Sequence, residues 1–323
     1  MKEITITDID GFFVGNAQDQ EGGTGCTAIL CPSGAVGGVD VRGGAPATRE
    51  TDLLNPVNTV ERIHCVMLSG GSAYGLAAAD GAMSYLEERN IGFDVQVGVV
   101  PIVPSACLFD LVVGNPKCRP DREMGYQALV NAEKETPRQG NVGAGTGATV
   151  GKLLGPQRAM KSGLGIYAAQ AGDVKVGAVV AVNALGNVVD YETGKNLAGL
   201  LNEEGTEIVS TRDAIYQMAD TSFDVFRGNT TIGCIVTNAK LTKAAASKVA
   251  SMAHNGYARG IMPVHTSNDG DTIFAMAAGE VEAMTDVVGT LAADVMARAI
   301  KSAVLSAESA YGFLSAGALS HGS

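Results

Sequence analysis

Apolar and polar positions divide this 323-residue chain into short runs of Val, Ile and Thr and longer stretches of strong helix formers. Short runs rich in β-branched residues predict buried strands, and the longer stretches predict helices. The predicted strands are 24–31, 62–68, 95–103, 106–113, 163–171, 175–189 and 230–237. The predicted helices are 72–88, 121–135, 242–255 and 285–309.

Local signals refine the ends of these elements. Thr242 is a predicted helix N-cap, and Asn255-Gly256 is a pair typical of a helix end. Gly172 and its neighbours interrupt two alternating apolar runs, which predicts an antiparallel hairpin. Antiparallel strands beside long helices favour a layered α+β fold over a doubly wound parallel sheet.

Composition restricts the possible classes of protein. Glycine accounts for 42 residues, and these fall at irregular intervals, which excludes collagen and a flexible linker. A formal net charge of −11 without a basic stretch argues against binding to nucleic acid. An apolar content of 46% is enough to build a core and excludes disorder. The glycines are therefore expected to allow unusual backbone angles and close contacts.

Signals for export, membranes and metals are weak. The start of the chain lacks a basic segment followed by an apolar one, so no signal peptide is expected. No apolar run approaches the length of about 18 residues that a membrane span needs. The six cysteines form no CxxC pair and are interpreted as free thiols in a reducing cytoplasm. With four histidines and no HExxH motif, neither a metal nor another cofactor is expected.

The most glycine-rich segment, 140–152, is the first candidate site. It is not a P-loop, because five residues instead of four separate Gly145 from Gly151. Lys152 ends the segment and is the only charged residue within 139–157. The loop either packs closely for structural reasons or presents a lysine that tunes a nucleophile.

The second candidate is the junction Asn229-Thr230-Thr231, which follows Gly228 and precedes a buried strand. Its simplest interpretation is a Gly-Asn turn that enters an ordinary strand. The alternative is a latent N-terminal nucleophile, in which a hydroxyl attacks the preceding carbonyl and later uses its own α-amine as base.

The third candidate is the acidic triplet Asp269-Gly270-Asp271, just before another apolar run. A solvated turn is the simplest explanation, and an EF-hand is excluded because Glu280 stands at the wrong position. His265 lies nearby, but its sequence neighbours offer no nucleophile that it would serve as general base.

Several segments taken together resemble one family. It comprises self-processing aminopeptidases and amidohydrolases, including the L-aminopeptidase/D-esterase, the β-peptidyl aminopeptidases and the nylon-oligomer endo-hydrolase. The Asn-Thr junction and the Asp-Gly-Asp triplet are most similar to the nylon-hydrolase branch. The segments that carry the resemblance are 68–81, 100–104, 108–111, 140–152, 181–184 and 229–231.

This resemblance implies a four-layer αββα sandwich of the N-terminal-nucleophile-hydrolase type, formed by 1–323 as a single domain. It also implies cleavage between Asn229 and Thr230 into chains 1–229 and 230–323. Thr230 would be the nucleophile for a small peptide or amide substrate, and no cofactor is implied. A homo-oligomer, namely a tetramer of processed protomers, is the expected assembly.

The resemblance also implies roles for other residues. Lys152 and Asn183 correspond to residues beside the nucleophile, with Asn183 as an oxyanion donor and Lys152 as an electrostatic group. Asp269 and Asp271 correspond to the acids that orient the nucleophile. Phe109 stands where some relatives carry a tyrosine that can donate a hydrogen bond, so that contribution is either absent or supplied by another group such as Tyr74. The predicted substrate contacts are Ser72, Tyr74, Phe109, Gly145 and Thr146.

The leading hypothesis is therefore a threonine amidohydrolase for small peptides or linear amide oligomers, nylon oligomers among them. An exo-acting aminopeptidase or β-aminopeptidase and an acyltransferase similar to ornithine acetyltransferase share the same fold. A binding protein that is never processed is the alternative outside the enzymes.

Overall fold

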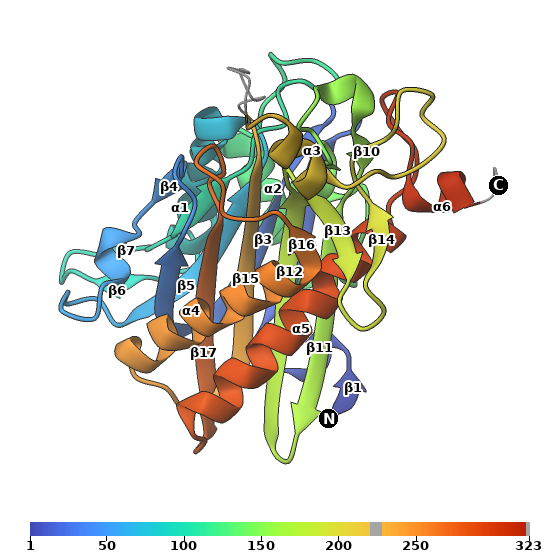
Figure 1. Cartoon of the computed structure of the whole chain (residues 1–323). Coiled ribbons are helices and arrows are strands. Elements are labelled where there is room, and N and C mark those ends of the chain that lie inside the picture. Colours follow the sequence, from blue (N-terminus) through green and yellow to red (C-terminus); the bar gives the residue numbers. More distant parts are fainter. Residues whose placement is uncertain (220–227, 321–323) are drawn as a thin grey trace.

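The computed structural model describes residues 1–219 and 228–320 of the chain (Figure 1). In this part of the chain, ten strands form one continuous sheet in the order β1-β11-β12-β15-β17-β3-β5-β8-β4, with β2 paired to β3. The strands are β1 (Lys2–Ile4), β2 (Phe13–Asp19), β3 (Thr24–Val41), β4 (Thr48–Arg49), β5 (Arg62–Ser69), β8 (Ser105–Cys107), β11 (Leu164–Ala171), β12 (Val174–Asn183), β15 (Thr230–Ala239) and β17 (Thr272–Val281).

Strand β3 connects two halves of this sheet. Its first part, up to Leu30, pairs with β2 and β5, whereas Val36–Val41 pairs with β17. The pairing between β3 and β5 shifts register between Leu30 and Ala35, where Gly34 adopts φ +78°. Such an irregularity bends a strand, so a single long strand takes part in both halves of the sheet.

Helices cover both halves of the sheet. Helices α1 (Ala78–Glu87) and α2 (Arg122–Lys134) pack near β2, β3 and β5, whereas α4 (Lys243–Gly260) and α5 (Thr285–Leu305) cover β11, β12 and β17 (Figure 1). The described residues contain three buried apolar clusters, one under each helix pair and one between the sheet halves. Three cores separate four layers, which confirms the predicted αββα arrangement.

Smaller elements connect these layers. The remaining strands are β6 (Phe93–Asp94), β7 (Val99–Val100), β9 (Thr149–Val150), β10 (Met160–Lys161), β13 (Asn187–Asp190), β14 (Lys195–Ala198) and β16 (Ile261–Met262). The remaining helices are α3 (Thr211–Gln217), α6 (Ala316–Ser320) and 3₁₀ turns at Ile6–Asp8, Asp52–Leu54, Ser72–Ala77, Gly143–Gly145 and Pro156–Arg158. None of the helices within 1–219 and 228–320 combines the length and apolar character of a membrane span.

Several sequence predictions are confirmed. Ala171 pairs with Val174 across a two-residue turn, so the predicted hairpin joins β11 and β12. The hydroxyl of Thr242 accepts the amide of Ala245 at 3.2 Å and caps α4. All six cysteines are free, and all except Cys118 are buried. The predicted helix 72–88 begins instead as a 3₁₀ turn and becomes α-helical at Ala78.

Four predicted strands are wrong in extent. The predicted strand 24–31 is too short, because β3 continues to Val41. The segment 95–103 contains only β7, in a small hairpin with β6 whose tip, Val97, is 95% exposed. The segment 106–113 continues β8 only to Cys107, because the following backbone turns toward the candidate site. The segment 175–189 breaks after Asn183, and β13 then joins a separate sheet with β14 and β16.

The predicted helix end at Asn255-Gly256 is also wrong, since α4 continues to Gly260. A Cβ atom on Gly256 would lie 2.6 Å from the carbonyl oxygen of Ala293 in α5. Gly256 therefore permits close helix packing in the middle of α4 and does not terminate it.

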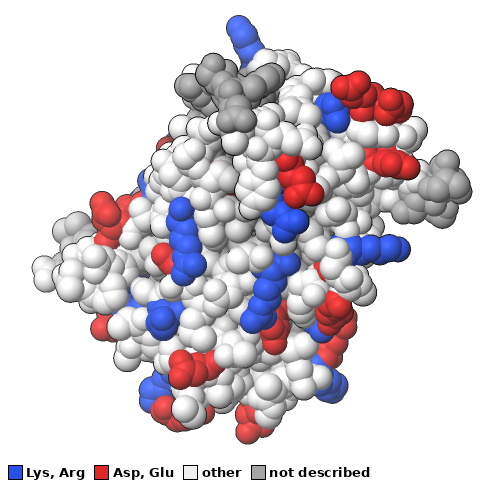
Figure 2. Space-filling model, viewed as in Figure 1, with Lys and Arg blue, Asp and Glu red and all other residues white. Residues whose placement is uncertain are grey.

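The outer face of α4 and α5 carries acidic and basic side chains interspersed among uncharged ones (Figure 2). Arg259 of α4 and Asp294 of α5 form an ion pair of 2.5 Å across the two helices. Because both side chains are partly exposed, this pair contributes little to stability compared with the apolar contacts beneath it.

Candidate active site

The start of β15 brings Thr230 beside Asn183, the last residue of β12. The two residues are directly paired in the antiparallel register of these strands. Thr230 is 4% exposed, and Asn183 is fully buried. The Thr230 hydroxyl lies against the carbonyl oxygen of Asn229, which belongs to the peptide bond that precedes it. Residues 220–227, shortly before this junction, lie outside the described residues.

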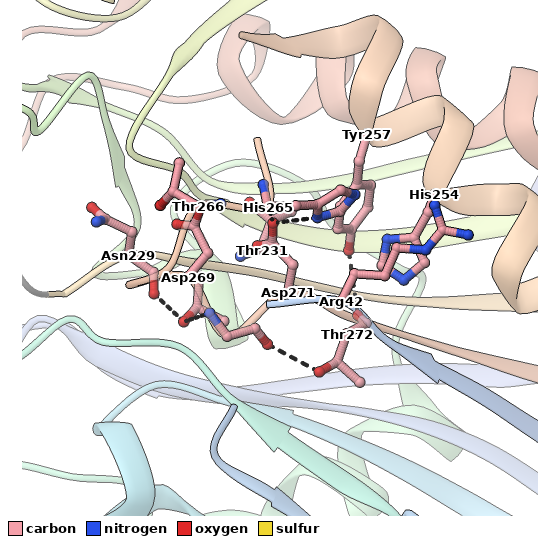
Figure 3. Close-up of polar contacts among 12 residues, drawn as sticks. Arg42, Asn229, Thr231, His254, Tyr257, His265, Thr266, Asp269, Asp271 and Thr272 are labelled. Atoms are coloured by element: carbon pink, nitrogen blue, oxygen red, sulfur yellow. Dashed lines mark hydrogen bonds and ion pairs between the residues drawn. The ribbon is translucent and has the colours of Figure 1, made fainter. Parts of the chain in front are cut away.

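The strand order explains why the acidic triplet Asp269-Gly270-Asp271 lies beside Thr230. Strand β17 runs parallel to β15, with Thr272 opposite Ile232, so the residues before both strands meet at one edge of the sheet. Asp271 accepts the amide of Thr231 through Oδ1 at 2.7 Å, and the amide of Gly270 donates to the Thr230 hydroxyl at 3.1 Å. Figure 3 shows both acids beside the junction.

Asp269 is buried beside its own turn. Its Oδ2 accepts the amide of Thr266 at 2.6 Å, whereas its Oδ1 has no hydrogen-bond partner among the described residues. Burial, reinforced by the neighbouring charge of Asp271, raises the pKa of Asp269 to about 6. An unsatisfied carboxylate oxygen at this depth is an acceptor available to a new donor.

Lys152 follows β9 and is fully buried. Its Nζ donates to the carbonyl oxygen of Asn183 at 2.9 Å, which places the amine beside the residue paired with Thr230. Burial lowers the pKa of Lys152 to about 7, opposed by the charges of Asp269, Asp110 and Asp271. A lysine with this pKa exchanges a proton readily near neutral pH.

The side chain of Asn183 is held from two sides. Its Oδ1 accepts the amide of Thr149 at 3.0 Å, and its Nδ2 donates to the carbonyl oxygen of Phe109 at 2.8 Å. Thr149 belongs to the glycine-rich segment and Phe109 to the loop after β8. These bonds fix the Asn183 side chain at the edge where Thr230 begins its strand.

Two charged residues that sequence reasoning missed lie close to this network. Asp110 accepts the Thr24 hydroxyl at 2.7 Å and the Gly71 amide at 2.6 Å, and burial raises its pKa to about 6. Lys161 donates to three carbonyl oxygens, those of Gly145, Ala148 and Ser162, and burial lowers its pKa to about 7. Asp110 lies in segment 108–111, which carries the family resemblance, and the signal for Lys161 was a charge beside an apolar run.

The predicted substrate-contact residues divide into two groups. Phe109 is tied to Asn183 through its carbonyl, and the Ser72 amide donates to Leu108, the residue before Phe109, at 2.9 Å. Tyr74 is 60% exposed, and the guanidinium of Arg119 covers its ring at 3.8 Å. These contacts place Ser72 and Phe109 near the Asn183 side of the site.

Gly145 and Thr146 are buried within the glycine loop. The hydroxyl of Thr146 donates to Gly143 at 2.8 Å, and a Cβ on Gly145 would lie 2.0 Å from the amide nitrogen of Leu164. Both residues therefore serve the packing of the loop, and their contact with substrate stays a prediction. Among the described residues, no group of three His, Cys, Asp or Glu side chains is arranged to hold a metal.

Replacing Gly270 by alanine should slow the amide hydrolysis that is expected from the sequence by about tenfold or more. The added Cβ would lie 2.8 Å from the Thr230 hydroxyl oxygen, so that hydroxyl must move. Turnover of an amide substrate, measured beside a melting curve, checks this expectation. The matched control is Gly317→Ala in α6, an exposed position where an added Cβ would lie 4.0 Å from the Ser315 hydroxyl oxygen and no left-handed backbone is involved. Equal rates for the wild type and Gly270→Ala would contradict it.

The sequence profile named Peptidase family S58 matches residues 5–316. The chain belongs to peptidase family S58. An uncharacterized aminopeptidase of Mycobacterium leprae is 44% identical and aligns with 95% of this chain and 92% of its own length. A 6-aminohexanoate-oligomer endohydrolase of Kocuria sp. is 33% identical and aligns with 88% of this chain and 78% of its own.

A solved structure supports the fold. The L-aminopeptidase D-Ala-esterase/amidase of Ochrobactrum anthropi, described as a variant of the Ntn hydrolase fold, superposes with a TM-score of 0.70 at 18% identity. The match covers 97% of this chain and 90% of that one. The predicted family and the N-terminal-nucleophile-hydrolase-like fold are therefore confirmed. The family assignment, together with the relative named as an endohydrolase, supports a peptide or amide hydrolase.

Proposed function

We propose that this S58 chain cuts its own bond between Asn229 and Thr230 and then hydrolyses amides with Thr230 as nucleophile. The observation that supports this most is the placement of the Thr230 hydroxyl against the Asn229 carbonyl oxygen, at a buried strand start. The adjoining Lys152 and Asp269, with pKa values of about 7 and about 6, can exchange protons near neutral pH. A turn that only leads the chain into a strand would not require a buried lysine and a buried carboxylate beside it.

Self-cleavage begins when the Thr230 oxygen attacks the carbonyl carbon of Asn229. The hydroxyl proton passes to a base, which returns it to the Thr230 nitrogen as the C–N bond breaks, leaving an ester on Thr230 and a free α-amine. Water then hydrolyses the ester and releases the Asn229 carboxylate. Since no α-amine exists before this cut, the neutral form of Lys152 supplies the base, which its lowered pKa permits.

Turnover uses the amine that the cut has released. The Thr230 oxygen attacks the substrate carbonyl, the α-amine takes the proton, and the substrate amine leaves with that proton. Water hydrolyses the acyl ester and regenerates Thr230. The buried Oδ1 of Asp269 is an acceptor for the charged α-amine, and Asn183 offers its second Nδ2 hydrogen to the developing oxyanion.

The proposed substrates are small peptides and linear amide oligomers. The endohydrolase relative, named for 6-aminohexanoate oligomers, supports linear amides. The higher identity to a relative named aminopeptidase favours a second candidate, removal of an N-terminal residue from a peptide. The two differ in one requirement, because an aminopeptidase needs a free amine on its substrate.

Intact-mass measurement of the denatured wild-type protein tests the proposed function. Two species split after Asn229 are expected, together with hydrolysis of 6-aminohexanoate oligomers and short peptides. Substrates with an acetylated amino terminus separate the two candidates, since only endo-hydrolysis accepts them. A permanently single chain with full amidase activity would overturn the proposal.

A further inference from the structure

The ring of His265 faces Asp271 on the side away from Thr231. Asp271 uses both carboxylate oxygens: Oδ1 accepts the Thr231 amide, and Oδ2 contacts His265 Nδ1 at 2.8 Å and the His265 amide at 3.1 Å. Figure 3 shows the imidazole and the carboxylate facing each other. Because a carboxylate only accepts hydrogen bonds, the Nδ1 proton of His265 donates to Asp271.

Helix α4 holds the imidazole in this orientation. The His265 ring stacks on Tyr257 at a centroid distance of 6.0 Å and meets the edge of His254 at 4.8 Å. Tyr257 and His254 both lie on the buried face of α4. The ring therefore has little freedom to turn its donor away from Asp271.

His254 does not compete for the carboxylate. Its Nε2 donates to the carbonyl oxygen of Asp40 at 3.0 Å, and burial lowers its pKa to about 4. At neutral pH it is an uncharged ring whose bonded nitrogen points to a different strand. His254 thus supports His265 by packing, and only His265 reaches Asp271.

We propose that His265 is a positioning residue that aims Asp271 at the Thr231 amide and so presets the Thr230 hydroxyl for attack. The Thr231 amide belongs to the peptide unit that directly follows Thr230, so fixing it fixes the backbone on which the hydroxyl stands. The same carboxylate anchors the segment whose Gly270 amide touches that hydroxyl. The role rests on the proposed function of Thr230 but concerns a residue outside the reacting atoms.

Two replacements of His265 distinguish the contribution of its Nδ1 donor from that of its ring. His265→Asn places an amide nitrogen where Nδ1 stood, and asparagine tolerates the left-handed backbone that His265 adopts at φ +57°. His265→Gln keeps a polar side chain but places its nitrogen where Nε2 stood, which cannot reach Asp271. We expect His265→Gln to slow self-cleavage and lower kcat by about tenfold to a hundredfold with KM unchanged, and His265→Asn to stay within about threefold of wild type.

The control for ring packing is His254→Gln, whose amide can still donate to Asp40. It should leave self-cleavage and kcat within about twofold of wild type. If His254→Gln is as slow as His265→Gln, the effect comes from packing and the proposal is overturned. The same holds if His265→Asn fails as badly as His265→Gln, or if His265→Gln matches wild type.

A readout independent of catalysis keeps this proposal distinct from the function of Thr230. In an uncut Thr230→Ala background, amide hydrogen exchange at Thr231 should be about tenfold faster with His265→Gln than with His265→Asn. If the wild-type chain is never cut but the exchange rates at Thr231 differ in this way, the assignment of Thr230 as nucleophile is wrong. The positioning role of the His265–Asp271 contact is then still supported. Equal exchange in both variants would contradict the positioning role even in a protein that processes itself.

Discussion

Replacing Thr230 by alanine should leave one uncut chain without measurable amidase activity. The change removes the oxygen that lies against the Asn229 carbonyl and the only proposed nucleophile for substrate. Loss of a nucleophile lowers turnover by on the order of 10⁴-fold or more, because the remaining groups only bind and polarise the substrate. Intact mass and an amide-hydrolysis assay on the same preparation measure both losses.

Two further variants, at Thr230 and Thr231, test whether the Thr230 hydroxyl itself is the nucleophile. Thr230→Ser keeps a hydroxyl on the same carbon, so it should still produce both fragments, though more slowly. Thr231→Val removes the adjacent hydroxyl, which is buried without a hydrogen-bond partner among the described residues, and keeps the amide that Asp271 holds. Cleavage should therefore persist in Thr231→Val. Full processing of Thr230→Ala, or its loss only in Thr231→Val, would assign the chemistry to another residue.

The strands and helices of the core were largely predictable because their local patterns agree with their burial. The run 230–237 is apolar, lies in the middle of the sheet as β15, and was found with its correct first residue. The segment 95–103 has a similar apolar pattern but pairs only with β6, in a two-stranded sheet apart from the ten-stranded one, and Val97 is exposed at the tip of that hairpin. Local pattern indicates which residues favour a strand, whereas pairing depends on distant partners.

The roles of the glycines also depend on distant partners that the local sequence does not show. Gly256 looked like a helix end because such glycines commonly follow the last turn, yet it allows α5 to approach α4. Gly70 and Gly147 are explained by a contact invisible in the sequence, since a Cβ on either would lie within 3 Å of the Asp110 side chain. The high glycine content therefore reflects close packing around buried charges as well as turns.

The candidate site came from the resemblance, and the structure assembles its residues at one edge. Thr230, Asn183 and Lys152 are joined by strand register and one hydrogen bond. Asp110 and Lys161 were not predicted as site residues. A buried charged residue is distinguished by its hydrogen-bond partners, and most of those partners are distant in the sequence. Lys161, for example, bonds carbonyl oxygens 16 and 13 positions earlier in the chain, and no local pattern marks such contacts.

Replacing Lys152 by methionine should slow self-cleavage by about a hundredfold or more, the usual contribution of a positioned base or electrostatic group. The side chain keeps its approximate length, but the amine beside Asn183 is gone. Buried acids nearby can take up protons in its absence, so the protein should still fold. Cell-free synthesis followed by a time course of fragment formation measures the rate, and a melting curve verifies the fold. An unchanged rate would mean that Lys152 has only a structural role.

The pH dependence identifies which form of Lys152 acts. Burial lowers its pKa from the usual lysine range to about 7, so its neutral fraction grows as the pH rises through that value. Asp269, with a pKa of about 6, has already ionised by then. Self-cleavage of the wild-type precursor should therefore rise about tenfold per pH unit below about pH 7 and level off above it. Lys152→Arg, which keeps a cation that cannot act as base, should be as slow as Lys152→Met; a near-normal rate would show that the positive charge is the active form.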